Sequence, residues 1–329
     1  MFAEAIESIL NDHCAPNAVR EIEAGGQGEA LLAALKDSGF FGLLAREDDG
    51  GGGAGMTDFF PVVLLCGAHS VPLPLVQTMA ARLLVTSQAG LPEGLIAFAP
   101  NAMRAADGSV RAERVSMGKR ASHVIAGVDG SLLVLAAADA QITDTGVAGS
   151  MSATFHWPPS SGQPLPDATT DIDTFRALAA LLHAGLMAGA MKRCFEMTLA
   201  YGNERVQFGK SIGKFQSIQH SLSVMAEHVA AGCMAAEAAF SSGEKGLPGI
   251  AACAAAKART SEAAQLVATI AHAIHGAIGV TAEYDLQLST RRLHEWRMAH
   301  GSESYWNRLL GGLVLRSGTP LISDFVRTI

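Results

Sequence analysis

The chain has 329 residues, of which 49% are hydrophobic and 17% charged, and its formal net charge is −7. This length allows two or three compact units with a sizeable buried core, and the composition excludes wholesale disorder. Because the chain is acidic and has no run of Lys or Arg, nucleic acids and anionic membranes are not expected as partners.

The cysteines and the N-terminus favour a cytoplasmic protein. Five cysteines lie far apart and never form a Cys-x-x-Cys pair, so the sequence predicts neither a disulfide framework nor a zinc ribbon. Glu4 and Glu7 stand where a secretory signal would carry positive charge. An uncharged stretch over 59–81 contains three prolines and is expected to be buried soluble structure rather than a membrane span.

Residues 1–92 are typical of short helices joined by glycine-rich turns, with one helix expected over 29–36. Gly50, Gly52 and Gly55 match the spacing of a dinucleotide-binding loop. No buried strand precedes them, and the adjacent acidic residues 47–49 would repel phosphate. A mobile surface turn is therefore expected there.

Residues 93–157 predict a small β-domain. Short β-rich segments over 110–115, 123–128 and 131–135 are separated by the turn signals Asp107-Gly108 and Asp129-Gly130. A proline-rich stretch over 158–170 cannot continue a helix and is expected to be a linker.

Residues 171–329 predict a helical bundle. Apolar residues recur at helical spacing along three long segments, and a fourth helix is expected over 282–298. Breaks are expected at Gly202-Asn203, Gly243 to Pro248 and Gly276 to Gly279, and a last helix from the N-cap Ser302 through Leu315. The expected fold class is mainly α: an N-terminal helical domain, a small β-domain and a C-terminal four-helix bundle.

Metal-binding patterns are not found. No Glu-x-x-His pair of a di-iron bundle is present, and His294-Glu295 is followed by a histidine only at His300, too far for a zinc protease motif. His272 and His275 share a helix face without a third ligand nearby, which indicates polar contacts in a packed bundle.

The segment 205–216 concentrates positive charge in an acidic chain. Arg205, Lys210 and Lys214 accompany two glycines and the aromatic residues Phe208 and Phe215. Such a loop could bind an anionic, ring-bearing ligand, or it could be a solvated basic loop between helices; the residues alone leave both readings open.

The pattern Arg205-x-Gln207-Phe208-Gly209-x-x-Ile212-x-x-Phe215-Gln216, followed by His220, resembles the signature of the acyl-CoA dehydrogenase family. A second family-like segment runs from His275-Gly276 through Gly279 to Arg292, and a third surrounds the glycines near residue 50. The resemblance is to a short bacterial subgroup, some of whose members act in the breakdown of steroids or other bulky acyl-CoA thioesters.

This resemblance implies an FAD-dependent oxidoreductase that desaturates an acyl-CoA thioester and passes electrons to an electron-transfer flavoprotein. It also implies a homo-oligomer or hetero-oligomer in which FAD lies between subunits. The residues expected to bind the cofactor are Arg205, Gln207, Phe208, Gln216, His275, Gly276 and Gly279.

The chain departs from the family pattern at the catalytic base, which is a Glu in the family. Ungapped alignment places His300 or Ala179 at the two family positions, so the candidates for the base are His300 and the nearby Glu303. The β-domain is also truncated and lacks the family's Trp-Ile-Thr strand. Two alternatives follow: a non-catalytic subunit that completes a partner's FAD site, and an acyl-CoA-binding helical protein without redox activity.

Overall fold

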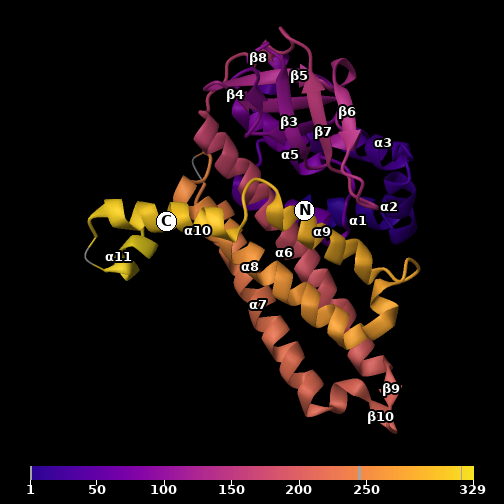
Figure 1. The fold of residues 1–329 in the computed structure, drawn as a ribbon. Helices are drawn as coiled ribbons and strands as arrows, with labels where there is room; N and C mark the ends of the chain where they lie inside the picture. The colour runs from indigo at the N-terminus through magenta and orange to yellow at the C-terminus, as the bar shows by residue number, and fades with distance from the viewer. Residues whose placement is uncertain (1, 244–245, 320) are drawn as a thin grey trace.

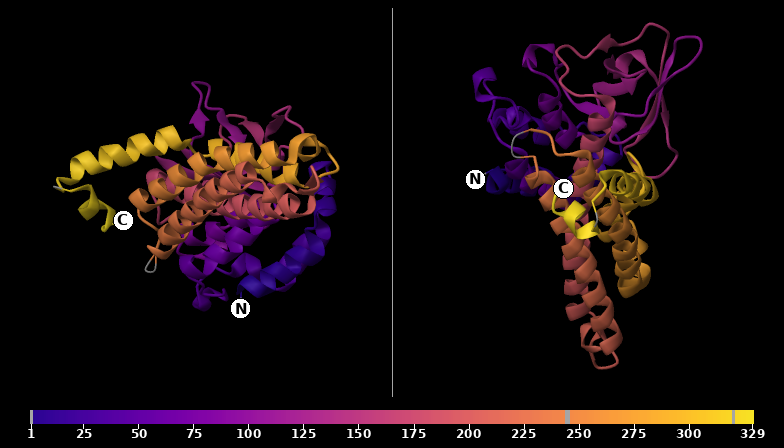
Figure 2. Two further views of the ribbon diagram at one scale, coloured as in Figure 1. Left: turned by 90° about the horizontal axis from the view of Figure 1, so that it is seen from below. Right: turned by 90° about the vertical axis from the view of Figure 1, so that its left-hand side faces the viewer.

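A computed structural model describes residues 2–243, 246–319 and 321–329 of the chain. The short N-terminal helices and two small sheets lie at one end of a group of long helices, and the long helices extend away from them (Figures 1 and 2). This arrangement confirms the predicted fold class. The N-terminal helices are α1 (Phe2–His13), α2 (Pro16–Glu23), α3 (Glu29–Asp37), α4 (Met56–Ala68) and α5 (Leu75–Ala80).

The glycine-rich run near residue 50 is not a phosphate-binding loop. A short 3-10 helix (Glu47–Asp49), and no strand, precedes it. The run folds back on the chain before it, since a Cβ atom added at Gly51 would lie 2.3 Å from the carbonyl oxygen of Ala45. A backbone packed this closely leaves no open cradle for a diphosphate.

The β-region forms two four-stranded sheets with strand orders β1-β4-β5-β8 and β2-β3-β7-β6. The hairpin turn at Asp129-Gly130 is confirmed, because both residues have positive φ (49° and 82°) between the paired residues Val128 and Ser131. The parallel pairing of β1 with β4 has no such local signal. The strands are β1 (Ile96–Ala99), β2 (Met103–Arg104), β3 (Val110–Val115), β4 (His123–Val128), β5 (Ser131–Ala136), β6 (Gln141–Asp144), β7 (Ala153–Trp157) and β8 (Gln163–Pro164), the last within the stretch predicted as a linker.

The C-terminal half contains the predicted bundle with shifted boundaries. The break expected at Gly202-Asn203 is wrong, because α6 keeps Gly202 buried and continues through Glu204. The fourth helix begins at Leu286 rather than at residue 282, because a 3-10 helix over 276–280 and further turns intervene. The break expected over 243–248 includes residues 244–245, which lie outside the described residues. The helices are α6 (Ile172–Glu204), α7 (Gln216–Ser241), α8 (Ile250–His275), α9 (Leu286–Met298), α10 (Glu303–Ser317) and the unpredicted α11 (Ile322–Val326).

Helix α6 is the central element, and residues 177–191 in its middle are all buried. It therefore joins the N-terminal helices and the bundle in one apolar core, whereas the β-sheets enclose a second, separate cluster. By length and composition alone, Ile172–Glu204 and Ile250–Val280 could each cross a membrane, with 89% and 44% of the apolar window buried inside the protein. Core helices of soluble proteins meet the same criterion, so this is weak support for a span.

Two glycines bring the backbones of α4 and α6 into contact. A Cβ atom at Gly189 would lie 1.8 Å from the carbonyl oxygen of Leu64, and one at Gly67 would lie 2.1 Å from that of Leu186. Backbone atoms cannot move aside as a flexible side chain can. The distance between the two helices is therefore set by the absence of a side chain at these positions.

Replacing Gly189 with Ala is expected to lower the free energy of unfolding by about 1–3 kcal/mol, because the added methyl group forces the two helices apart. The matched control is Gly311→Ala on α10, where an added Cβ meets nothing within 4 Å. That variant should be up to about 1 kcal/mol more stable through better helix propensity. Urea unfolding of both proteins checks the prediction, and equal shifts of the same sign would contradict it.

Candidate functional site

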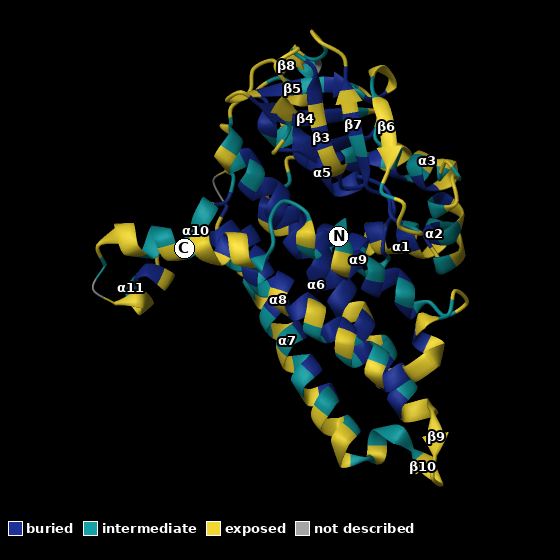
Figure 3. Cartoon of the chain, viewed as in Figure 1, coloured by how far each residue is buried: buried dark blue, intermediate teal, exposed yellow. Residues whose placement is uncertain are grey.

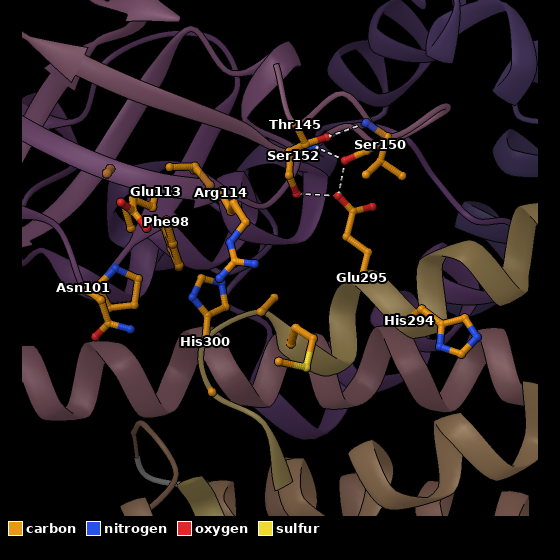
Figure 4. A pocket seen from close by; sticks show the side chains of 18 of the residues that line it. Phe98, Asn101, Glu113, Arg114, Thr145, Ser150, Ser152, His294, Glu295 and His300 are labelled. Atoms are coloured by element: carbon orange, nitrogen blue, oxygen red, sulfur yellow. Dashed lines mark hydrogen bonds between the residues drawn. The ribbon is translucent and has the colours of Figure 1, made fainter. Parts of the chain in front are cut away.

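A cavity of about 470 Å³ lies between the β-sheets and the C-terminal end of α9 (Figure 4). This volume is in the range of sites for small-molecule ligands. Its walls come from β1, β3, the β6–β7 loop, α9 and the loop that follows α9. The residues that line it include Phe98, Arg114, Val115, Ser150, Ser152, Arg291, Glu295, Met298 and His300.

His300, one of the two predicted candidates for the catalytic base, is among the residues that line this cavity. It lies between α9 and α10 with a φ of 56°, and its carbonyl oxygen accepts a hydrogen bond from Trp306 Nε1 at 3.0 Å. The ring Nε2 is buried and has no hydrogen-bond partner among the described residues. Burial, together with the nearby His183 and Lys257, holds the pKa of His300 well below its usual range, so the ring is neutral at pH 7.

A second histidine, His183, packs against the ring of His300; the sequence analysis did not identify it as a site residue. His183 on α6 is fully buried, and its ring centroid lies 4.6 Å from that of His300. Its Nδ1 lies 2.9 Å from the carbonyl oxygen of Ala179 and must carry the proton, so Nε2 accepts from Ser116 Oγ at 2.9 Å. Burial lowers the pKa of His183 to about 3. His183 therefore stays neutral, and its two hydrogen bonds hold its ring in one orientation against the ring of His300.

Lys257 on α8 anchors the loop that carries His300. Its fully buried Nζ donates to the carbonyl oxygens of Trp296 (3.1 Å) and Arg297 (2.8 Å) and to Ser261 Oγ (3.0 Å). The two carbonyls belong to the last turn of α9, whose carbonyls have no partner within the helix. Burial lowers the pKa of Lys257 to about 7, although the nearby Glu303 acts in the opposite direction.

The depressed pKa of Lys257 predicts a pH-dependent stability. Its pKa is about 7 in the folded chain against an ordinary 10.5, so between these values the unfolded chain binds more protons and the folded state gains stability as pH rises. The difference in free energy of unfolding between the wild type and Lys257→Met should therefore grow above pH 7, by up to about 1.4 kcal/mol per pH unit. Urea unfolding at pH 6, 8 and 9.5 measures it, and a constant difference would exclude this titration.

Glu303, the other candidate base, is engaged elsewhere. Its carboxylate accepts hydrogen bonds from Arg297 Nε at 3.0 Å and from Nη2 of the same guanidinium. Burial would raise the pKa of Glu303, yet the hydrogen bonds from Arg297 and the charges of Arg297 and Lys257 lower it overall. Glu303 is not one of the described residues that line the cavity.

Glu295 is a cavity carboxylate that sequence reasoning did not single out. One of its oxygens accepts hydrogen bonds from Ser150 Oγ (2.7 Å) and Ser152 Oγ (2.5 Å), as the dashed lines in Figure 4 show. Its second oxygen lies 3.4 Å from the buried guanidinium of Arg292. These contacts hold the β6–β7 loop against α9, and Glu295 is thus part of the cavity wall.

The predicted cofactor-binding residues lie at the opposite end of the bundle. Strands β9 (Val206–Gln207) and β10 (Lys210–Ser211) form a small hairpin at the end of α6, coloured as exposed in Figure 3. We call residues 205–216 the tip. Arg205, Gln207 and Gln216 are exposed on it, and Lys210 Nζ lies 4.3 Å from the ring centre of Phe215.

Phe208 occupies an unfavourable position at the tip. It forms the hairpin turn with Gly209, and both have positive φ (52° and 78°). Glycine or asparagine normally fills such a turn, because a bulky side chain is strained there. The Phe208 side chain is also 92% exposed. Its one aromatic contact among the described residues is edge-to-face with Phe215, at a centroid distance of 6.2 Å. That contact leaves nearly all of the ring in solvent, and a strained, exposed aromatic ring of this kind indicates contact with another molecule.

His275, Gly276 and Gly279 lie close to the tip rather than to the cavity. The ring of Tyr201, one helical turn before Arg205, stacks on His275 with centroids 4.4 Å apart. His275 is buried, and its Nε2 has no partner among the described residues. Gly276 has a φ of 64° and open space where a Cβ would be. All seven predicted cofactor-binding residues therefore gather at one end of the bundle.

Comparison with known proteins identifies the family. The chain is 30% identical over 313 residues to the acyl-CoA dehydrogenase IpdE2 of Mycolicibacterium smegmatis, covering 89% of this chain and 91% of that protein. The chain belongs to the acyl-CoA dehydrogenase family. Residues 172–310 also match the family model of the acyl-CoA dehydrogenase C-terminal domain. The suspected resemblance is thus confirmed, and with it the assignment to a family of oxidoreductases.

Solved structures of the family have the same fold. The ChsE4-ChsE5 complex from Mycobacterium tuberculosis matches with a TM-score of 0.80 at 18% identity, covering 97% of each chain. A Tcur3481-Tcur3483 steroid ACAD variant matches with a TM-score of 0.78 at 20% identity, covering 96% of this chain and 97% of that one.

Members of this family use FAD, and the tip has the chemistry to hold part of such a nucleotide. Arg205 has no ion pair among the described residues and could donate two parallel hydrogen bonds to phosphate oxygens. Phe208 presents a flat apolar surface, and the open backbone at Gly276 allows close approach. Because the tip lies away from this chain's own cavity, these residues suit a nucleotide held by a neighbouring subunit.

Proposed function

We propose that this chain is a subunit of an FAD-dependent acyl-CoA dehydrogenase that desaturates a bulky acyl-CoA thioester. It extends its tip to the FAD of a second, full-length subunit, which carries the catalytic Glu. The observation that carries this proposal is the strained, exposed Phe208 on the tip, near Arg205, which has no ion pair within the described part of the chain.

The chain's own cavity supports a division of labour between two different subunits. A desaturase needs a carboxylate or another base to take the α-proton. Of the carboxylates considered above, Glu295 is bound by two serines and Glu303 by Arg297. Two of the similar solved structures, ChsE4-ChsE5 and Tcur3481-Tcur3483, are each named for two proteins. This supports an enzyme built from two different subunits.

When bound, FAD would supply the chemistry of hydride acceptance from the β-carbon of the thioester. This chain's residues would position that cofactor: Arg205 binds its phosphates, and Phe208 covers its apolar surface. The electrons then pass to an electron-transfer flavoprotein.

A homomeric enzyme is the second candidate, and the position of His300 favours it. The neutral His300 ring lines the cavity, and its buried Nε2 has no partner among the described residues, so it is placed to accept a proton from a bound substrate. Burial and the nearby His183 and Lys257 hold its pKa well below the usual range, so it would act only as a weak base. In this version the same chain would hold the flavin in its own cavity and lend its tip to an identical neighbour.

Co-expression tests the two candidates. The chain is produced alone and together with a full-length acyl-CoA dehydrogenase from the same genome, and dye-coupled oxidation of straight-chain and ring-bearing acyl-CoA thioesters is measured. The proposal predicts oxidation by the complex and none by this chain alone. Oxidation by the isolated chain that is lost in His300→Gln would support the homomeric enzyme. Acyl-CoA binding without flavin in any pairing would overturn both and favour a binding protein without redox activity.

A further inference from the structure

The cavity residue Arg114 has an unusual backbone conformation, and its side chain has no hydrogen-bond or ion-pair partner among the residues that the structure describes. Arg114 lies on β3, where the pairing with β7 shifts between Ala112 and Val115, which is a β-bulge. Its φ is 46°, and its amide donates to Thr154 Oγ1 at 3.2 Å. Bulges and positive φ values at non-glycine residues re-aim side chains and occur next to functional sites. Here the bulge directs Arg114 into the cavity, toward the ring of His300 (Figure 4).

The charges around the cavity leave Arg114 uncompensated. Arg291 is paired with Glu23 at 2.8 Å, and Glu295 is engaged by Arg292 and the two serines. Glu113, next to Arg114 in the chain, forms an ion pair with Arg111 at 3.1 Å. Among the described residues no carboxylate pairs with Arg114. The histidines of the cavity add no positive charge, because burial lowers the pKa of both His294 and His300.

One unpaired guanidinium matches one negative charge. A carboxylate fits this site better than a doubly charged phosphate, because a single guanidinium balances its one negative charge completely while donating two parallel hydrogen bonds to its oxygens. The buried Nε2 of His300 also has no partner among the described residues, and its N–H tautomer could donate to the same carboxylate.

The rest of the cavity is suited to an apolar body. Phe98, Val115 and Met298 contribute to its walls, and its volume of about 470 Å³ is far larger than a simple anion requires. We propose that this cavity binds an apolar carboxylic acid, with Arg114 as the receptor of its carboxylate. The ligand is either a free acid or an acyl-CoA whose acyl chain ends in a carboxylate. This inference rests on the proposed function in one respect only: the flavin must be held by the other subunit, so that this cavity is free for the acid.

Calorimetric titration of the full chain tests this assignment with cyclohexanebutyrate and its neutral amide as probes. The acid should bind at least about tenfold more tightly than the amide, since a charge-assisted pair contributes on this order. Arg114→Gln should abolish that preference. The matched control is Arg104→Gln on the neighbouring strand β2, which should retain it because neither Arg104 nor its ion-pair partner Asp129 is one of the cavity-lining residues. Equal binding of acid and amide by the wild type, or an unchanged preference in Arg114→Gln, would overturn the assignment.

Two further measurements distinguish a free acid from an acyl-CoA as the ligand and test whether FAD competes for the cavity. If adipoyl-CoA binds more tightly than hexanoyl-CoA, the ligand is an acyl-CoA whose acyl chain ends in a carboxylate. If the two thioesters bind equally and the free acid binds tightly, the ligand is a free acid. Displacement of the acid by FAD would show a flavin pocket and overturn the proposal. His300→Gln keeps Arg114 and should weaken acid binding without removing the preference for acid over amide. If the acid fails to bind while the co-purified complex still carries flavin, this inference fails and the proposed function stands.

Discussion

Replacing Arg205 with Ala is expected to weaken the retention of FAD by the assembled enzyme about 10- to 100-fold, the effect of losing charge-assisted hydrogen bonds to phosphate. The fold of this chain should not change, because the Arg205 side chain has no ion pair among the described residues. The measurement is the FAD content of the purified complex over a dilution series, together with dye-coupled activity at limiting FAD.

Two variants sharpen this prediction. Arg205→Lys keeps the charge but loses the planar fork, so it should fall between the wild type and Arg205→Ala. Lys192→Ala removes a positive charge from an exposed position on the same helix and should behave as wild type. If Lys192→Ala and Arg205→Ala lose equal amounts of FAD, the effect reflects net charge, and the assigned contact of Arg205 is wrong.

Replacing Glu23 with Gln is expected to have the largest effect on stability, about 3–5 kcal/mol. Arg292 is completely buried, and its guanidinium lies 2.7 Å from the Glu23 carboxylate, whose side chain is itself buried. Removing one charge of a buried pair costs far more than the pair contributes, and without Glu23 the buried guanidinium keeps only the more distant Glu295, at 3.4 Å. The Glu23–Arg292 pair joins α2 to α9 across most of the sequence, and Arg292 also donates to the carbonyl oxygen of Gly149 at 3.0 Å.

Urea unfolding measures this effect, with Glu21→Gln as the control. Glu21 is on the same helix but exposed, so its substitution should change the free energy of unfolding by less than about 0.5 kcal/mol. Because the same contacts hold the β6–β7 loop, Glu23→Gln should also weaken binding of ligands to the cavity. A Glu23→Gln protein as stable as the control would show that Glu295 alone compensates the charge of Arg292.

The predicted elements that the structure confirms have local signals in the sequence. The bundle helices follow from the 3.6-residue spacing of apolar side chains, and the β4–β5 hairpin follows from Asp129-Gly130. The boundary at Gly202 was predicted wrongly, because a buried glycine inside a long helix resembles a helix end when packing is unknown.

The missed residues depend on contacts between distant parts of the chain. Lys257 meets the last turn of α9 some forty positions later, and Arg292 meets Glu23 at a separation of 269 residues. No spacing rule connects such pairs. His183 looks like an ordinary polar residue within an apolar helix until the fold places it beneath His300.

Arg114 is different, because the sequence holds a signal for it. Apolar and polar residues alternate along β3 from Val110 to Ala112, but Glu113 and Arg114 are two consecutive polar residues before the buried Val115. A shift of one residue in an alternating strand is what a β-bulge produces. A closer reading of that strand could therefore have predicted that Arg114 points differently from its neighbours.

The central claim is that this chain completes a flavin site in a second subunit. The most direct test is to measure FAD per polypeptide, by absorbance after denaturation, for the chain purified alone and for the complex with a full-length partner. We expect almost no FAD on the isolated chain and close to one FAD for each pair of unlike subunits. Close to one FAD on the isolated chain would contradict it, because the chain's own cavity would then hold the flavin and the homomeric enzyme would be the correct description.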